Sequence, residues 1–173
     1  YVAWLEGRGF TAEAERCHGY AQRSPLGFSR ELPGPVGERN AYALLPRGVL
    51  RCMARNVAGL LRQVGAAFAT GNRVVLPADA AYADVFDTLP ADLRALIGQE
   101  TAEDRISAVL YEGDGDALTG IAATLADSQP QVVPVYAMLS PAEDYPLEWL
   151  VTERSVSTNT AAAGGNASLM SIG

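Results

Sequence analysis

Cysteine and histidine, the side chains best suited to nucleophilic or metal chemistry, are scarce in this chain, which has two cysteines and one histidine. Cys17 and His18 are adjacent, and successive helical positions point about 100° apart, so the two cannot act on one another as nucleophile and base. We interpret Cys17 as half-buried beside a surface His18, and Cys52, which ends an apolar run, as a core residue. The sequence contains no G-x-S-x-G, H-E-x-x-H or C-x-x-C motif, and no complete catalytic set is visible.

A Gly-Asp-Gly turn at 113–115 lies between an apolar strand and a helix, where dinucleotide-binding proteins hold a pyrophosphate. Leu118 replaces the third glycine of that motif. Glu112, Asp114 and Asp116 surround the turn, and three carboxylates would repel a diphosphate and could occupy the helix amides themselves. The local charge therefore predicts a self-capped turn and argues against a nucleotide.

The same three carboxylates, each two residues from the next, also suggest a Ca²⁺ or Mg²⁺ site. A calcium loop of the EF-hand type needs further oxygen ligands downstream and a glutamate at its twelfth position. Counted from Glu112, that position is Ala123. The pattern gives little support to a metal, and we expect none.

Composition limits the classes of partner. With 173 residues, 49% apolar and 19% charged, the chain is about one domain long and can form a core. Its net charge of −7 argues against nucleic acid and anionic membranes. All 13 basic residues are arginine, which excludes a Schiff-base lysine and a P-loop. The two cysteines fit a reducing cytoplasm, and the start at Tyr1 without a signal peptide suggests part of a longer polypeptide.

Apolar periodicity predicts alternating strands and helices through the middle of the chain. The clearest helix begins at the capping residue Asn56 and carries one apolar stripe. Strands are expected at 40–45, 49–54, 73–76, 106–111 and 131–138, and helices at 56–70, 79–89, 92–97 and 116–127. This alternation predicts an α/β fold, a Rossmann-like parallel sheet with helices on both faces, over residues 40–152.

The two ends of the chain differ from this central unit. Residues 1–24 are expected to form a helical lead-in with Thr11 as an N-cap. Its expected inward face consists of Ala14, Cys17 and Ala21. Residues 25–39 are rich in proline and glycine and are expected to form a connecting loop. Residues 153–173 alternate in character and then become rich in small residues, which predicts a C-terminal β-flap that packs on this domain, another domain or a second chain.

Two segments resemble a known protein family. Leu32–Pro46 reads LPGPVGERNAYALLP, and Glu153–Gly173 reads ERSVSTNTAAAGGNASLMSIG. Both are similar to the C-terminal end of bacterial proline utilization A, and the resemblance covers most of the chain. That family joins a flavin-dependent proline dehydrogenase to an NAD-dependent aldehyde dehydrogenase that oxidises glutamate semialdehyde. The resemblance implies that FAD and NAD are cofactors of the parent protein.

Within this resemblance, Pro46–Asp79 is similar to the first unit of an aldehyde dehydrogenase NAD domain, but the functional groups differ. Asn56 falls at the family's oxyanion-hole asparagine, yet the surrounding prolines and aromatic residues are absent, so we interpret it as a helix cap. The family's ribose-binding lysine has no counterpart around Leu76-Pro77, and its phosphate turn corresponds to the acidic residues 112–115. The nucleophilic cysteine and general-base glutamate belong to segments that this chain does not contain. The resemblance implies the architecture of a cofactor domain with no catalytic residue, bound cofactor or metal.

The role implied by the resemblance is structural. The domain would pack on the catalytic aldehyde dehydrogenase module of the same polypeptide, cover the cavity through which the intermediate passes, and support assembly, including homo-oligomers, through its flap. The flap residues expected to make contacts are Arg154, Val156, Asn159, Gly164, Gly165, Asn166, Leu169 and Met170. Two alternatives stay open: a domain that retains weak NAD binding, and a flap that mediates homodimerisation without any link to catalysis.

Overall fold

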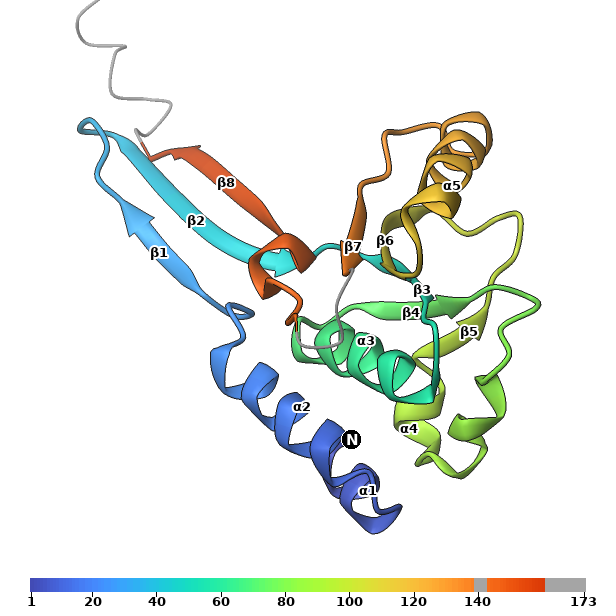
Figure 1. Ribbon diagram of the computed structural model, residues 1–173. Coiled ribbons are helices and arrows are strands. Elements are labelled where there is room, and N and C mark those ends of the chain that lie inside the picture. Colours follow the sequence, from blue (N-terminus) through green and yellow to red (C-terminus); the bar gives the residue numbers. More distant parts are fainter. Residues whose placement is uncertain (139–142, 161–173) are drawn as a thin grey trace, which may run out of the picture.

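The computed structural model describes residues 1–138 and 143–160, and this part of the chain forms two sheets (Figure 1). The larger sheet is parallel, with the strand order β5-β4-β3-β6-β7. Its strands are β3 (Val49–Met53), β4 (Arg73–Leu76), β5 (Ile97–Gln99), β6 (Ile106–Glu112) and β7 (Val135–Met138). The chain winds outward from β3 in one direction and then from β6 in the other, as in a Rossmann-like half. The expected α/β class is confirmed.

Helices lie on both faces of this sheet. α3 (Val57–Ala69) covers one face and α5 (Gly115–Ser128) covers the other (Figure 1). Successive strand residues point to opposite faces. Leu50 and Cys52 therefore pack in the core cluster with α3, whereas Val109 packs with Leu125 of α5. The double-sided burial explains why the strands read as continuous apolar runs.

The helical lead-in consists of α1 (Val2–Gly7) and α2 (Thr11–Arg23), and α2 packs against α3. Gly9 separates the two helices with φ 79°, a left-handed conformation that favours glycine. The α2–α3 contact depends on Gly65, because a Cβ there would overlap the Sγ atom of Cys17. α3 is consequently covered by the sheet on one side and by α2 on the other.

Three details of the helices differ from the expectation. Phe10 is the N-cap of α2, and Thr11 is its first residue, so the predicted Thr11 cap is wrong. Ala21 is exposed and Tyr20 is buried instead, because the larger aromatic side chain removes more apolar surface from water. The apolar pattern of residues 116–127 predicts Ala122 on the inward face of α5, but Ala122 is exposed, because α5 meets the sheet through a narrower stripe that includes Leu125.

The second sheet is antiparallel and projects away from the parallel one (Figure 1). It consists of β1 (Ser29–Leu32), β2 (Glu38–Pro46) and β8 (Val151–Asn159), in the order β1-β2-β8. We call this three-stranded sheet the arm. Its register places Tyr42 of β2 between Arg30 of β1 and Ser155 of β8.

Two predicted segments differ from the expectation because they form part of the arm. Residues 25–39, expected to be a loop, contain β1, and their prolines and glycines fall largely in the turn that leads to β2. The strand expected at 40–45 is present as part of β2, but it pairs with β1 and β8 and is not in the parallel sheet. Local composition carries no information about which strand will be the partner, which is why the pairing was not predicted.

The connection from β4 to β6 is less helical than expected. Residues 79–89 contain only a short 3₁₀ helix, η1 (Ala83–Thr88), and α4 (Ala91–Arg94) ends before Ile97. Ile97 instead begins β5, which pairs with β4 at the sheet edge. A second 3₁₀ helix, η2 (Leu147–Leu150), leads into β8.

Candidate functional site

The strand order defines where a ligand of a doubly wound sheet would bind. β3 and β6 are neighbours, and the helices that follow them, α3 and α5, lie on opposite faces. In such sheets ligands bind outside the carboxyl ends of the strands at the point where the winding reverses. We call the space between the ends of β3 and β6 the switch-point crevice and treat it as the first candidate site.

Asn56 lies on the β3 side of this crevice and caps α3. Its Oδ1 atom accepts a hydrogen bond from the backbone N–H of Gly59 at 2.8 Å. The side chain thereby satisfies one of the helix amides that has no partner within the helix. The predicted capping role is confirmed.

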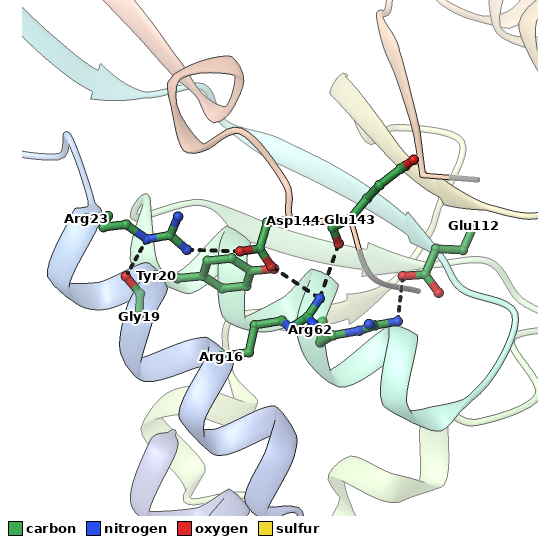
Figure 2. A network of polar contacts seen from close by, with 8 residues as sticks. All are labelled: Arg16, Gly19, Tyr20, Arg23, Arg62, Glu112, Glu143 and Asp144. Carbon is green, nitrogen blue, oxygen red and sulfur yellow. Dashed lines mark hydrogen bonds and ion pairs between the residues drawn. The ribbon is translucent and has the colours of Figure 1, made fainter. Parts of the chain in front are cut away.

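Glu112, the last residue of β6, reaches across the crevice to the first turn of α3. Its carboxylate lies so close to Gly59 that a Cβ atom there would overlap it. Its Oε1 atom lies 3.4 Å from Nη2 of Arg62, the contact drawn as a dashed line in Figure 2. Both side chains are about 11% exposed. The backbone of Arg55 and the hydroxyl of Tyr145 also favour the ionised form of this carboxylate and lower its pKa. In the sequence Glu112 belongs to the acidic turn, and nothing local points to a partner 50 residues away.

Burial dominates the electrostatics of Glu112. It raises the pKa of the carboxyl above its usual value, and the opposing effects of the Arg62 charge, of Arg55 and of the Tyr145 hydroxyl only partly counteract this rise. Gln63 of α3 extends the network, since its side-chain N–H donates to the hydroxyl of Tyr145 at 2.9 Å. The crevice is thus occupied by hydrogen-bonded side chains of the chain itself.

Asp114 occupies the other anion-binding position of the crevice, the start of α5. Its Oδ1 atom accepts from the backbone N–H of Ala117 at 2.9 Å, and the hydroxyl of Tyr111 donates to its backbone carbonyl at 3.0 Å. The predicted self-capped turn is confirmed. Within residues 1–138 and 143–160 no cluster of three or more histidine, cysteine, aspartate or glutamate side chains has metal-binding geometry.

A cavity of about 290 Å³ lies beside the crevice, beyond the ends of β3 and β4. Its lining is mixed, with Met53, Leu60 and Tyr82 beside the charged Arg55 and Asp79. The hydroxyl of Tyr82 donates to the backbone carbonyl of Arg55 at 3.3 Å and ties the loop after β4 to the end of β3. The cavity could admit a small molecule. Cys52 also lines it, but this side chain is 1% exposed, and burial raises the pKa of its thiol, which disfavours the nucleophilic thiolate.

Both cysteines are buried, at 3% exposure for Cys17 and 1% for Cys52. Burial, the largest effect, together with the nearby Glu13 raises the pKa of the Cys17 thiol to about 12, and burial also raises the pKa of Cys52. His18 is exposed and bonds to Gln22. The core role of Cys52 and the surface position of His18 are confirmed, and Cys17 is more deeply buried than expected.

The arm is the second candidate site. All of β8 after Val151 is exposed, although its nine residues pair with β2 along their whole length. Strand alternation places Arg154 and Val156 on one face and Asn159 on the other. The remaining predicted flap residues, Gly164, Gly165, Asn166, Leu169 and Met170, lie outside the described residues.

The face of the arm that includes Asn159, opposite to Arg154 and Val156, carries an aromatic pair. The rings of Phe28 and Tyr42 meet edge to face at 6.2 Å, and Phe28 is 49% exposed. Leu32, 37% exposed, lies two residues beyond Arg30 on the same face. Exposed apolar residues of this size on a thin sheet are typical of surfaces that contact another body.

A polar network ties the segment before β8 to the lead-in helix (Figure 2). Asp144 lies 3.2 Å from both Nη1 of Arg16 and Nη2 of Arg23, and the hydroxyl of Tyr20 donates to it at 3.2 Å. Arg16 also donates to the backbone carbonyl of Glu143 at 3.2 Å. Nothing local in the sequence indicates these contacts, since they join residues more than 120 positions apart.

No helix in the part of the chain that the structure describes is both long and apolar enough to span a membrane. No family model matches the chain.

Curated proteins give clear sequence matches. The chain is 39% identical to the bifunctional protein PutA of Rhizobium meliloti over 100% of its own length. It is 38% identical to the PutA of Escherichia coli over 91% of its length. It spans only 15% and 12% of the length of these two relatives.

Solved structures agree with these matches. A crystal structure of proline utilization A from Bradyrhizobium japonicum matches 72% of the chain with TM-score 0.52 and 23% identity, and the chain covers 15% of it. An NAD-dependent benzaldehyde dehydrogenase from Corynebacterium glutamicum matches 74% with TM-score 0.53 and 15% identity, and the chain covers 31% of it. At these identities the structural matches show the fold alone. The chain is thus homologous along its length to a portion of the PutA family and has the fold of an aldehyde dehydrogenase domain.

Proposed function

We propose that this chain is a non-catalytic module of a PutA-type protein that converts proline to glutamate with FAD and NAD at other parts of the polypeptide. It packs on the catalytic aldehyde dehydrogenase module, covers the cavity through which the aldehyde intermediate passes, and supports assembly through its flap. A cytoplasmic location belongs to the same proposal. The observation that carries it is the arm, whose outer strand β8 is exposed along nearly its whole length.

The arm supports this proposal because it needs a neighbouring surface to be stable. A small β-sheet is marginal in water unless one face packs on something else. β1 is exposed throughout and β8 is exposed after Val151, so the arm buries little apolar surface of its own. Contact with another module would cover the Phe28 side, the Val156 side or the β8 edge, where backbone groups are available for strand addition.

The crevice supports the non-catalytic part of the proposal. Glu112 and Asp114 place carboxylates at the starts of α3 and α5, where they would repel the pyrophosphate of a dinucleotide. The experiment is a calorimetric titration of the 173-residue chain with NAD. No saturable heat is expected, whereas saturable micromolar binding would support the alternative of a residual NAD site and contradict this part.

The assembly role is tested in the parent protein by deleting residues 153–173. We expect proline dehydrogenase activity to persist, a longer lag before NADH appears when proline is the substrate, and weaker assembly by light scattering. An unchanged lag and an unchanged mass would contradict the role. Loss of dimers with a normal lag and normal dehydrogenase rates would favour the alternative of a flap that only mediates homodimerisation, which the exposed edge of β8 also fits.

A further inference from the structure

Glu112 combines four features that a merely solvated surface glutamate lacks. It ends β6 at the reversal of winding, its carboxylate lies over the first turn of α3, and it is about 11% exposed. The groups that favour its ionised form come from three separate parts of the chain: the residues before α3, α3 itself, and the segment that leads into β8. A ligand anion in a Rossmann-like crevice would meet the same kinds of donor, a helix start and an arginine.

We propose that the carboxylate of Glu112 is an internal anionic ligand, which fills the switch-point crevice and compensates the buried charge of Arg62 in place of a bound anion. This inference rests on the proposed function, in which the crevice takes no dinucleotide. It goes further by assigning one residue as the occupant and by giving the chemical class that the emptied site would accept, a small carboxylate.

Gly59 is the complementary half of this arrangement. Every residue with a Cβ at position 59 would collide with the Glu112 carboxylate and displace it from the helix turn. The asparagine cap holds the amide of the same glycine at 2.8 Å, which fixes the turn beneath the carboxylate. The hydroxyl of Tyr145 accepts a hydrogen bond from Gln63 of α3 at 2.9 Å, and it also lowers the pKa of Glu112, so the segment before β8 contributes to the surroundings of this carboxylate.

The test is chemical rescue of Glu112→Ala by acetate or formate in the full chain. Removing the carboxylate takes the Glu112 ion pair away from the guanidinium of Arg62, whose side chain is about 11% exposed. We expect the midpoint of thermal unfolding to fall by roughly 10 °C. Acetate, titrated against chloride at constant ionic strength, should enter the vacated space and restore about half of the loss or more, in a saturable manner.

Two matched variants separate this role from general stabilisation by salt. Glu112→Gln keeps the volume without the charge, so it offers no vacancy and its midpoint should not respond to acetate. Asp116→Ala removes an exposed carboxylate from the first turn of α5 and should not respond either. If acetate raised the unfolding midpoint equally in all the variants and the wild type, the inference would be wrong. It would also be wrong if Glu112→Ala unfolded at the same midpoint as the wild type.

Folding itself serves as the readout if Glu112→Ala does not fold in chloride. The urea-unfolded variant is then diluted into acetate or chloride, and recovery of helical circular dichroism in acetate only is the expected result. If it folds in neither solution, a double-mutant cycle with Arg62→Gln and Glu112→Gln measures the coupling free energy between the two side chains. A coupling near zero contradicts the proposal. These outcomes concern the variants, whereas NAD binding by the wild type bears on the proposed function. A failure of the Glu112 inference is therefore distinguishable from a failure of the proposed function.

Discussion

Asn56 and Asp114 perform the same task at the starts of two different helices. Each side chain accepts a hydrogen bond from the amide three residues later, at 2.8 Å in α3 and 2.9 Å in α5. Each lies at the carboxyl end of a central strand, where a cofactor domain would offer its free amides to a ligand. At the scale of single residues, side chains of the chain itself therefore bind helix amides at the crevice that a ligand would otherwise use.

Replacement of Asn56 tests the cap. Asn56→Ala removes the acceptor for the amide of Gly59, and we expect the free energy of unfolding to fall by about 1 kcal/mol. Asn56→Asp, which keeps the acceptor, serves as the control and should stay within about 0.5 kcal/mol of the wild type. Urea denaturation followed by circular dichroism measures both, and equal stability of Asn56→Ala and the wild type would show that the bond contributes nothing.

At the scale of elements, α3 is the centre of the molecule. The parallel sheet packs on one side of it, α2 packs on the other, and Glu112 and Tyr145 lie over its beginning. Its glycines fit this position, because Gly59 leaves room for a carboxylate and Gly65 leaves room for the thiol of Cys17. A helix buried on several sides needs small residues wherever a neighbour approaches its backbone.

Two glycine-to-alanine substitutions separate packing from helix propensity. Gly65→Ala places a Cβ where the Sγ atom of Cys17 lies, and we expect a loss of about 1–3 kcal/mol in unfolding free energy. Gly120→Ala, within α5, meets no atom within 4 Å and should stabilise by about 0.5–1 kcal/mol. Urea denaturation of both variants is the measurement, and the same sign for both would contradict the packing argument.

Asp144 connects two elements, α2 and the segment that enters β8. Asp144→Ala removes the common partner of Arg16, Arg23 and Tyr20. Because Asp144 is 41% exposed, solvent screens these pairs, and we expect a loss of only about 1 kcal/mol together with faster amide exchange near Tyr145.

The control for Asp144 is Glu31→Ala, which breaks the exposed pair with Arg39 in the arm and should change stability by less than about 0.5 kcal/mol. Hydrogen exchange and urea denaturation measure both variants. If Glu31→Ala had the larger effect, the anchoring role of Asp144 would be wrong.

At the scale of the whole molecule, the chain has a buried part and an exposed part. The parallel sheet and its helices contain the apolar core, and the arm extends from it with most of its side chains in water (Figure 1). The buried part also holds acids that ionise only at high pH. Burial raises the pKa of Cys17 to about 12 and raises the pKa values of Cys52, Tyr20 and Tyr145.

These shifts share one sign and predict a loss of stability in alkali. Each group keeps its proton more tightly when folded, so its contribution is complete below its ordinary pKa, 9.0 for Cys17, and is lost as the pH rises toward the folded value. Each ionising thiol should lower the unfolding free energy by about 1.4 kcal/mol per pH unit in that range. Urea denaturation at about pH 7.5 and about pH 10.5 measures the effect.

Cys17→Ala should reduce this slope, since it removes one of the groups. A stability that does not change from neutral to alkaline pH would contradict the prediction.

The local features were predictable because they depend on residues close together in the chain. The cap at Asn56, the strand 73–76, and the turn that Asp114 caps follow from side chains within three or four positions of one another. The acidic character of residues 112–116 and the absence of lysine were also visible in the sequence. These features were sufficient to predict an α/β fold in which the phosphate turn is acidic.

Only the tertiary structure decided which distant segments meet. Nothing in residues 40–45 shows that they pair with β8, and nothing near Glu112 points to Arg62 or Tyr145. The segment before β8 likewise needs the folded α2 to place Arg16 and Arg23 around Asp144. Such contacts follow from how whole elements pack, because burial of each apolar face determines which elements become neighbours and hence which polar groups must find partners there.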